Sequence, residues 1–176
     1  MRVLSTLGAG CALLLFSSVL LAENARLVVS VKPANNALKS NVEGYIGSLG
    51  ERDAEALQRF RRVVESQAEK AAQALGYYQA QITTDVVEQT PPRLNVNIVP
   101  GEPVRIGSVT VRVDGPAAEL RAFRLPKDAE LKQGARLNHG RYEAAKRHIQ
   151  NQASRYGFFH GRFTQQRLSI NPQAGL

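Results

Sequence analysis

The three histidines are the side chains of this chain best suited to metal binding or proton transfer. His139, His148 and His160 are separated by nine and twelve residues, spacings that do not set two ligands on one helix face. The sequence also has no serine-centred glycine motif and no paired carboxylate cluster. We therefore expect no enzyme activity, no metal and no cofactor. His148 is expected to be a solvated helix residue, and His139 to cap or pack near a helix start.

A glycine pair, Gly47 and Gly50, offers a second kind of chemistry. A Gly-x-x-Gly loop between two helices clamps nucleic-acid phosphates in KH domains. Here the intervening residues are serine and leucine and the next residue is Glu51, whereas a phosphate clamp requires nearby cations. A glycine-assisted helix turn accounts for the pattern. We expect no nucleic acid and no small-molecule substrate, and a KH-like nucleic-acid-binding protein stays as an alternative.

The first 22 residues have the organisation of a secretory signal peptide. Arg2 provides a positive charge, residues 11–22 form an apolar run, and charge returns at Glu23. We predict cleavage after Ala22; acylation of Cys11, as in a lipoprotein, is the alternative. Because Cys11 is the single cysteine, residues 23–176 can form no disulfide and must fold on an apolar core.

Charge is distributed unevenly along the rest of the chain. Residues 23–103 hold 9 lysines and arginines against 10 acidic residues, whereas residues 104–176 hold 13 against 5. The basic half is either a solvated surface or a patch for an acidic partner or lipid headgroups.

An internal repeat with an offset of 81 residues organises the chain. The stretch LGYYQAQI at residues 75–82 returns as YGFFHGRF at residues 156–163. Gly76 and Gly157 stand where glycine ends a helix in the left-handed conformation without steric cost. Upstream, apolar residues recur at helical spacing in both copies: Val64, Ala68, Ala72 and Leu75, then Ala145, Ile149, Ala153 and Tyr156. Each copy predicts a helix, a glycine stop and a turn into a strand, with the aromatic pairs as core packing.

Around the first copy we expect a unit of order β-α-α-β-β. Three segments read as strands: residues 26–31, 80–87 and 93–99. One helix face runs from Leu38 to Gly50, and Asp53 is suited to cap a second helix that continues to Leu75. With short connections, the third strand lies between the others, parallel to the first, and the second strand lies on an edge. The fold class is α+β, a three-stranded mixed sheet with two helices on one face.

Residues 104–176 repeat this unit in part. We expect a strand over residues 104–113, a short helix before Pro126, a helix over residues 138–157 and a strand over residues 161–170. The third strand has no counterpart. Burying each Val or Phe side chain is worth roughly 1.5–3 kcal/mol against a domain stability of roughly 5–15 kcal/mol, so the unit is incomplete without it. Either the chain is a piece of a longer protein, or another chain donates the strand.

These units and the connecting sequence VNIVPGEPVRIGSVTV resemble the POTRA domains of the TamA family, in the BamA/TamA superfamily of outer-membrane translocation and assembly proteins. The segment ARLVVSV and the segment NVEGYIGSL resemble the first such domain, and LKQGARLNHGRYEAAKRHIQNQASRYGFFHGRF resembles the second. The pattern of the second falls on Gly134, Leu137, His139, Tyr142, Glu143 and Lys146. The resemblance divides the chain into a signal peptide (1–22), a first POTRA domain (23–103) and a second (104–176) that lacks its last strand.

In that family, periplasmic POTRA domains precede a membrane β-barrel that assembles outer-membrane proteins, including autotransporters. The resemblance implies a periplasmic location associated with the outer membrane. It implies as partners a TamB-like protein anchored in the inner membrane and unfolded outer-membrane proteins. The missing barrel would provide the membrane link. A truncated, non-functional remnant is the alternative.

The binding residues are expected on sheet edges, because an edge strand exposes backbone N–H and C=O groups to which another chain can add. In the first unit we predict the second strand as this edge, at Gln81, Thr83 and Asp85. In the second unit the candidates are Arg162, Gln165 and Arg167.

Overall fold

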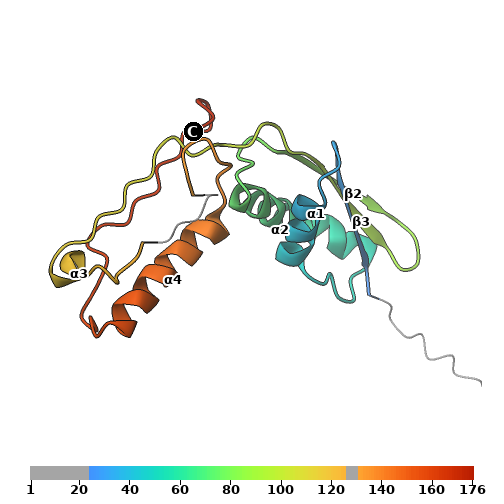
Figure 1. Cartoon of the computed structure of the whole chain (residues 1–176). Helices are drawn as coiled ribbons and strands as arrows, with labels where there is room; N and C mark the ends of the chain where they lie inside the picture. Colours follow the sequence, from blue (N-terminus) through green and yellow to red (C-terminus); the bar gives the residue numbers. More distant parts are fainter. Residues whose placement is uncertain (1–23, 126–130) are drawn as a thin grey trace, which may run out of the picture.

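The computed structural model of the chain describes residues 24–125 and 131–176, so the predicted signal peptide lies outside the described residues. Its strands are β1 (Arg26–Val31), β2 (Gln81–Val87) and β3 (Arg93–Val99). Its helices are α1 (Asn36–Ile46), α2 (Ala54–Ala74), α3 (Pro116–Glu119) and α4 (His139–Arg155). Figure 1 shows the sheet with α1 and α2 in one part of the molecule, and α3 and α4 in the other.

The sheet has the predicted topology, with strand order β1-β3-β2. β1 runs parallel to β3 and β2 runs antiparallel to it. Val96 of β3 is paired with Val29 on one flank and with Thr84 on the other. β3 is therefore the central strand, and β1 and β2 are both edges.

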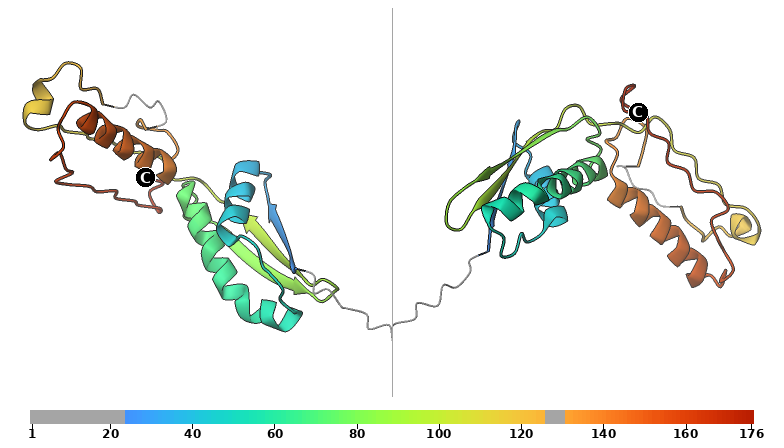
Figure 2. Two further views of the ribbon diagram at one scale, coloured as in Figure 1. Left: turned by 90° about the horizontal axis from the view of Figure 1, so that it is seen from below. Right: turned by 180° about the vertical axis from the view of Figure 1, so that it is seen from behind.

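One face of the sheet is buried under α1 and α2, which lie on the same side of it in Figure 2. Alternation along β3 turns Leu94, Val96 and Ile98 towards the helices, where each is at most 1% exposed. Leu57 and Val64 of α2 meet them in the same core. The sheet therefore has one apolar face and one polar face, as its alternating sequence predicts.

The helix boundaries confirm one predicted cap and correct one predicted end. The Asp53 carboxylate accepts a hydrogen bond from the Ala56 N–H at 2.7 Å, as an N-cap should. α1 ends at Ile46, not at Gly50, because Gly47 already takes the left-handed backbone with φ of 67°. Leu49 beyond it is still buried, as an anchor of the loop.

The repeated glycine stop is confirmed in both copies. Gly76 and Gly157 have φ of 89° and 82°. The next residue donates back to the helix in each case, from Tyr77 N to Ala72 O at 3.0 Å and from Phe158 N to Ala153 O at 2.8 Å. Both turns are thus the same capping motif, in which a residue after the glycine satisfies a helix carbonyl.

The two strands predicted for the second unit are wrong. Among the described residues, 104–113 and 161–170 form no ladder, and Arg105 has one isolated bridge, to Arg136. The predicted helix before Pro126 is the single turn α3, which ends at Glu119. The physical reason is the topology of the first unit, because its two outer strands bond to β3 and not to each other. Two outer segments without a middle strand have no strand with which to form a ladder.

Candidate functional site

The predicted binding strand β2 lies on an edge of the sheet, and Gln81, Thr83 and Asp85 are exposed on it. Their side chains alternate with the buried Thr84, so they lie on the polar face, opposite the helices. Asp85 accepts hydrogen bonds there from Asn95 Nδ2 at 2.8 Å and Asn97 Nδ2 at 3.4 Å. These contacts fasten the edge strand to the central strand on the open face.

The unpaired backbone of β2 belongs to a different set of residues from the one predicted. In an antiparallel ladder, alternate residues of an edge strand direct both backbone groups outwards. The Thr84 carbonyl is bonded by a side chain of α2, which indicates that Ile82, Thr84 and Val86 are the outward set. Gln81, Thr83 and Asp85 then bond to β3. The sequence alone could not show which residues of β2 face outwards, because this depends on how β2 and β3 pair.

Arg61 of α2 caps the middle of this edge. Its Nη2 donates to the Thr84 carbonyl oxygen at 2.6 Å and its Nε to Thr84 Oγ1 at 2.9 Å. Thr84 Oγ1 donates in turn to Glu65 at 2.5 Å. A charged side chain on an edge strand is a common protection against unwanted pairing. An incoming strand must therefore displace Arg61 to bond with Thr84.

The other edge, β1, carries no such cap. The Arg26 N–H donates to Pro92 O at 2.8 Å and the Lys32 N–H to Ile98 O at 2.9 Å, so the even-numbered residues of β1 face β3. Leu27, Val29 and Val31 therefore direct their backbone groups outwards. No residue within the described ranges bonds to these groups. Sequence reasoning missed this second edge, although the predicted strand order already contained it.

Two tyrosines of the repeated turn join the sheet-bearing part to residues 104–176. The buried Tyr77 hydroxyl accepts from Asn35 Nδ2 at 2.9 Å and from Arg136 Nη1 at 3.1 Å. The Tyr78 hydroxyl lies 2.6 Å from His139 Nε2, and burial raises the pKa of Tyr78 above its usual value of 10.0. We call this cluster, with Gly76, Val104 and Leu137, the joint.

The contacts of the joint correct part of the prediction that the aromatic pair Tyr77 and Tyr78 is core packing. The Val104 N–H donates to Gly76 O at 2.8 Å, and the Leu137 N–H donates to Val104 O at 2.9 Å. Both Val104 and Leu137 are buried. Tyr77 is core packing as predicted, whereas Tyr78 contacts the second unit. His139 packs at the start of α4, as predicted, and its partner is this tyrosine.

The three candidates of the second unit do not form an edge. Arg162, Gln165 and Arg167 are exposed and lie in a segment without strand pairing. Arg167 donates from Nε to Ser169 Oγ at 3.0 Å. The expected edge is absent because its ladder partner is absent. The segment instead lines a groove beside α4.

The Gly47–Gly50 loop is engaged in packing. Leu49 is 1% exposed, and Gly50 accepts a hydrogen bond from the Ala25 N–H at 2.9 Å. The Arg52 guanidinium lies 4.2 Å from the centre of the Phe60 ring and donates to the Leu49 carbonyl. The loop therefore anchors the start of β1 to the helices. Among residues 24–125 and 131–176 there is no group of three or more metal-ligating side chains.

The match to a known family covers the sheet and its two helices. Residues 28–100 match the family model described as POTRA domain, TamA domain 1. The match begins inside β1 and ends one residue after β3, so it covers the β-α-α-β-β unit except for the first two residues of β1. Residues 28–100 are a TamA-type POTRA domain. This assignment agrees with the resemblance drawn from the sequence.

POTRA domains of this type are periplasmic modules of assembly factors that bind polypeptides and perform no catalysis. Within the part of the chain that the structure describes, no helix has the length and apolar character needed to cross a bilayer. Polypeptide binding by such a module can use the two exposed edges of its sheet.

Proposed function

We propose that residues 23–176 are the periplasmic polypeptide-binding part of a factor for outer-membrane protein assembly and autotransporter translocation. Residues 104–176 act as a second POTRA unit, supported by the repeated helix and capping turn. A TamB-like protein and unfolded outer-membrane proteins are the partners that the family suggests. The observation that carries the proposal is a POTRA sheet whose two outer strands keep backbone groups free for pairing.

In this proposal, client segments add as a further strand along β2. Ile82 and Val86 present free backbone groups on both sides of Thr84, and Arg61 swings aside to release the Thr84 carbonyl. Main-chain hydrogen bonds supply the affinity and leave side-chain identity largely unread. That property suits a module that receives many different β-rich clients.

A photo-crosslinking experiment tests this assignment. The probe is a synthetic peptide of about 10 residues that carries one membrane strand of an outer-membrane β-barrel protein. A photoreactive side chain replaces Thr83 on β2, Asn97 on β3 or Val28 on β1, all of which face away from the helices. We expect the highest adduct yield at position 83 and little at position 97, because the central strand has no free edge.

Two outcomes decide the question. Equal yields at positions 83 and 97, or none, would contradict strand addition on this sheet. A yield confined to position 28 would reject β2 and transfer the function to the uncapped edge β1.

The variant Arg61→Ala provides a second test of the same mechanism. Without the guanidinium, Thr84 loses its cap, and we expect the adduct yield at position 83 to rise. Arg62→Ala is the matched control, because this neighbouring arginine is exposed and the hydrogen bonds to Thr84 come from Arg61. A fall in yield with Arg61→Ala, in a variant that melts at an unchanged temperature, would show that Arg61 helps clients to bind.

A further inference from the structure

Three side chains at the β2 edge form a small network, which we call the latch: Arg61 and Glu65 of α2 and Thr84 of β2. The Arg61 guanidinium donates twice to Thr84, from Nη2 to the carbonyl oxygen and from Nε to Oγ1. Its Nη2 also lies 3.9 Å from Glu65 Oε1, which accepts a hydrogen bond from the Thr84 hydroxyl. Thr84 is 6% exposed, whereas the side chains of Arg61 and Glu65 are 37% and 33% exposed. The latch therefore joins a buried strand residue to two side chains that a bound chain can reach.

Strand addition would replace one bond of the latch and leave another in place. A client N–H that pairs with the outward Thr84 carbonyl displaces Arg61 Nη2 from it. The bond from Arg61 Nε to Thr84 Oγ1 can remain, because the Thr84 side chain points towards the helices and away from the added backbone. The guanidinium then stays at the edge with a donor that has lost its acceptor. Because an unpaired charged donor is costly where water is excluded, an acceptor on the client would stabilise the complex.

The client residue that pairs with Thr84 lies beside Arg61. Directly paired residues of neighbouring strands direct their side chains to the same face of a sheet, with Cβ atoms about 4.5–5.5 Å apart. An Asp or Glu at this position brings a carboxylate to the guanidinium, whose fork of N–H donors matches two carboxylate oxygens. The adjacent client positions point to the opposite face, where the exposed Asp85 repels an acidic residue paired with it. Arg61 therefore favours a carboxylate at the one client position that pairs with Thr84.

The next client positions on the helix-facing side favour apolar residues. Ile82 and Val86 lie two residues from Thr84 along β2 and pack against the core. Both are only partly buried at the edge, so an added strand would cover them. Apolar client side chains at the paired positions would be buried together with them. The edge therefore fits a segment with the pattern apolar-x-acidic-x-apolar.

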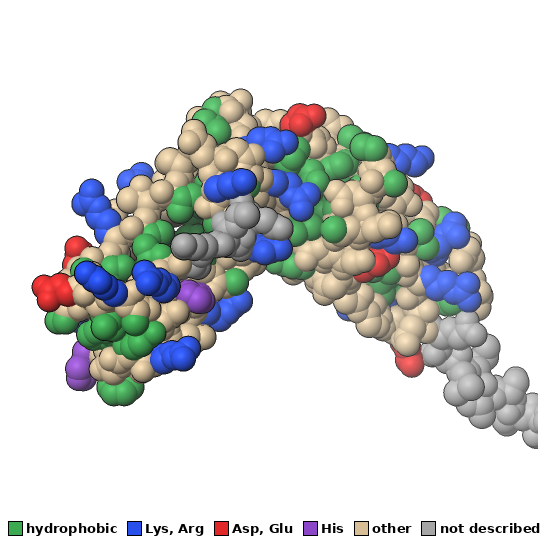
Figure 3. Space-filling model, viewed as in Figure 1, with side chains coloured by type: hydrophobic (Ala, Val, Ile, Leu, Met, Phe, Trp, Pro, Cys, Tyr) green, Lys and Arg blue, Asp and Glu red, His purple; other side chains and the backbone are tan. Residues whose placement is uncertain are grey.

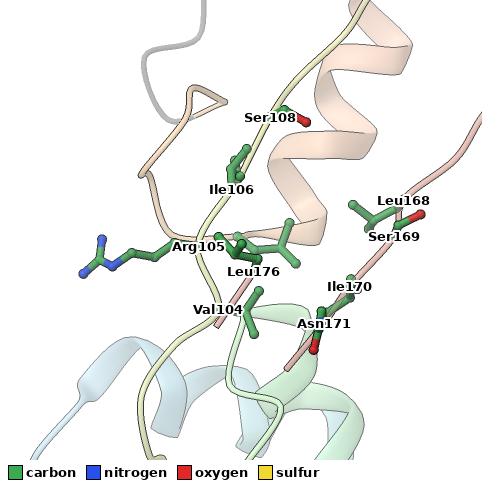
Figure 4. Close-up of a pocket in the computed structure, with 11 residues that line it drawn as sticks. Val104, Arg105, Ile106, Ser108, Leu168, Ser169, Ile170, Asn171 and Leu176 are labelled. Carbon is green, nitrogen blue, oxygen red and sulfur yellow. The ribbon is translucent and has the colours of Figure 1, made fainter. Parts of the chain in front are cut away.

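Other cations of the molecule are less suited to this recognition. Lys and Arg side chains are spread over both parts of the molecule in Figure 3, so they attract acidic peptides without fixing a position. A cavity of about 330 Å³ between residues 104–108 and 168–171 has one charged lining residue, Arg105. Its side chain points away from the cavity in Figure 4, and its Nη1 donates to Gly134 O at 2.9 Å. Among the described residues, Arg61 is the cation bonded to an outward backbone group of the sheet.

The internal repeat separates the latch from the framework of the fold. With the offset of 81 residues, the counterparts of the three latch residues are Tyr142, Lys146 and Gln165. The second copy thus has the helix and its glycine stop without the latch. The helix and its capping turn do not require these three residues, which supports a role for them in binding.

We propose that the β2 edge recognises one client side chain: Arg61 binds the carboxylate of an Asp or Glu that pairs with Thr84. The preferred clients carry this acidic residue between two apolar residues at alternate positions of an extended segment. This inference rests on strand addition at β2, as the proposed function describes it, and adds selectivity to that function.

Binding of three fluorescent peptides to the full chain tests the inference. The first, TVTVTETVTVT, has its acidic residue on the valine face, and the second replaces this Glu by Gln. The third, TVTVETTVTVT, has the composition of the first with Glu on the threonine face. We expect the first peptide to bind about tenfold more tightly than the other two, since a hydrogen bond between charged groups is worth about that factor.

Substitutions assign this preference to Arg61. Arg61→Ala should bring the first two peptides to equal affinity, because neither can then pair with a guanidinium. Arg61→Lys should retain part of the preference, since the charge remains but the fork of donors is lost. Arg62→Ala, at the neighbouring exposed arginine, is the matched control and should keep the tenfold ratio. A loss of fold stability would weaken both peptides alike and leave their ratio unchanged.

The contrary results are distinct. Equal affinity of the first two peptides, with photo-crosslinking of both from position 83, would overturn the inference and leave strand addition at β2 intact. Equal affinity of the first and third peptides would show unspecific attraction between charges and would also overturn it. A preference that survives Arg61→Ala would overturn it by assigning the carboxylate to another cation. Absence of binding by all three peptides would contradict the proposed function, and the inference with it.

Discussion

At the scale of single residues, Gly76 occupies the most crowded backbone position of the joint. A Cβ at this position would lie 2.6 Å from Leu137 O and 3.4 Å from Val104 O, both of them backbone atoms that cannot rotate away. Gly47 has a similar positive φ of 67°, but a Cβ there would meet nothing within 4 Å. Substitutions at the two glycines therefore distinguish two costs. A Cβ at either position meets the strain of a positive φ, and only a Cβ at Gly76 also meets a steric clash with the second unit.

Gly47→Ala should lower the free energy of unfolding of the POTRA domain by about 1–2 kcal/mol, the cost of the left-handed conformation for a residue with a Cβ. Gly76→Ala should cost more, because the contact with Leu137 must also open. Urea unfolding followed by circular dichroism measures both. Equal losses for the two variants would show that the joint does not restrain this glycine.

Tyr78 makes the joint sensitive to alkaline pH. Burial raises the pKa of its hydroxyl above 10.0, so above this pH the unfolded chain releases the proton while the folded chain still binds it. Stability is therefore fully retained below about pH 10 and falls as the pH rises towards the folded-state pKa. Melting temperatures of the chain and of Tyr78→Phe between about pH 8 and pH 11 test this. The decline should be shallower for Tyr78→Phe, and identical slopes would contradict the assignment.

At the scale of elements, one strand decides which of two similar units has a packed core. β3 contributes Leu94, Val96 and Ile98 to the interior and holds both neighbours in register. α4 repeats the apolar face of α2 but has no fully buried residue. The same sequence pattern therefore gives a sheet in one place and unpaired extended chain in the other.

Substitutions at one valine in each unit test this difference. Val96→Ala should lower the free energy of unfolding by about 2–3 kcal/mol, since two buried methyl groups are lost and a cavity forms. Val111→Ala should change it by less than about 0.5 kcal/mol, because that side chain is 44% exposed. Denaturant titration of the two variants checks the pair. A large loss at Val111 would mean that residues 108–114 are packed in solution.

The sequence predicts elements well where their partners lie in the same unit. The strand order follows from short connections between elements, the Asp53 cap from the preference of aspartate for the N-cap, and both glycine stops from helical spacing and the conformational freedom of glycine. The sequence alone could not show that residues 104–113 and 161–170 form no strands. Alternating apolar residues indicate a preference for extended structure, but a strand forms only when a neighbouring strand is present to pair with it. Which residues of β2 direct their backbone outwards, and the contact of Arg61 with Thr84, depend on tertiary pairing. The outward residues Ile82 and Val86 could therefore not be predicted.

At the scale of the whole molecule, the joint connects two surfaces of different character. The POTRA domain offers polar strand edges and carries nearly balanced charge, while residues 104–176 carry a net charge of +8 and an apolar groove. Tyr77, Tyr78 and Gln79 bridge them through hydrogen bonds to Arg136, His139 and Pro172; the last runs from Gln79 Nε2 to Pro172 O at 3.0 Å.

Residue-resolved amide hydrogen exchange of the full chain, with and without the membrane-strand peptide, tests the central claim most directly. In the free chain, the amides of Thr83 and Asp85 should exchange slowly, and those of Ile82 and Val86 should exchange fast. Bound peptide should slow Ile82 and Val86 and leave Thr83 and Asp85 unchanged, because strand addition protects only outward N–H groups. Saturating peptide that leaves Ile82 and Val86 exchanging as fast as before would contradict strand addition at β2.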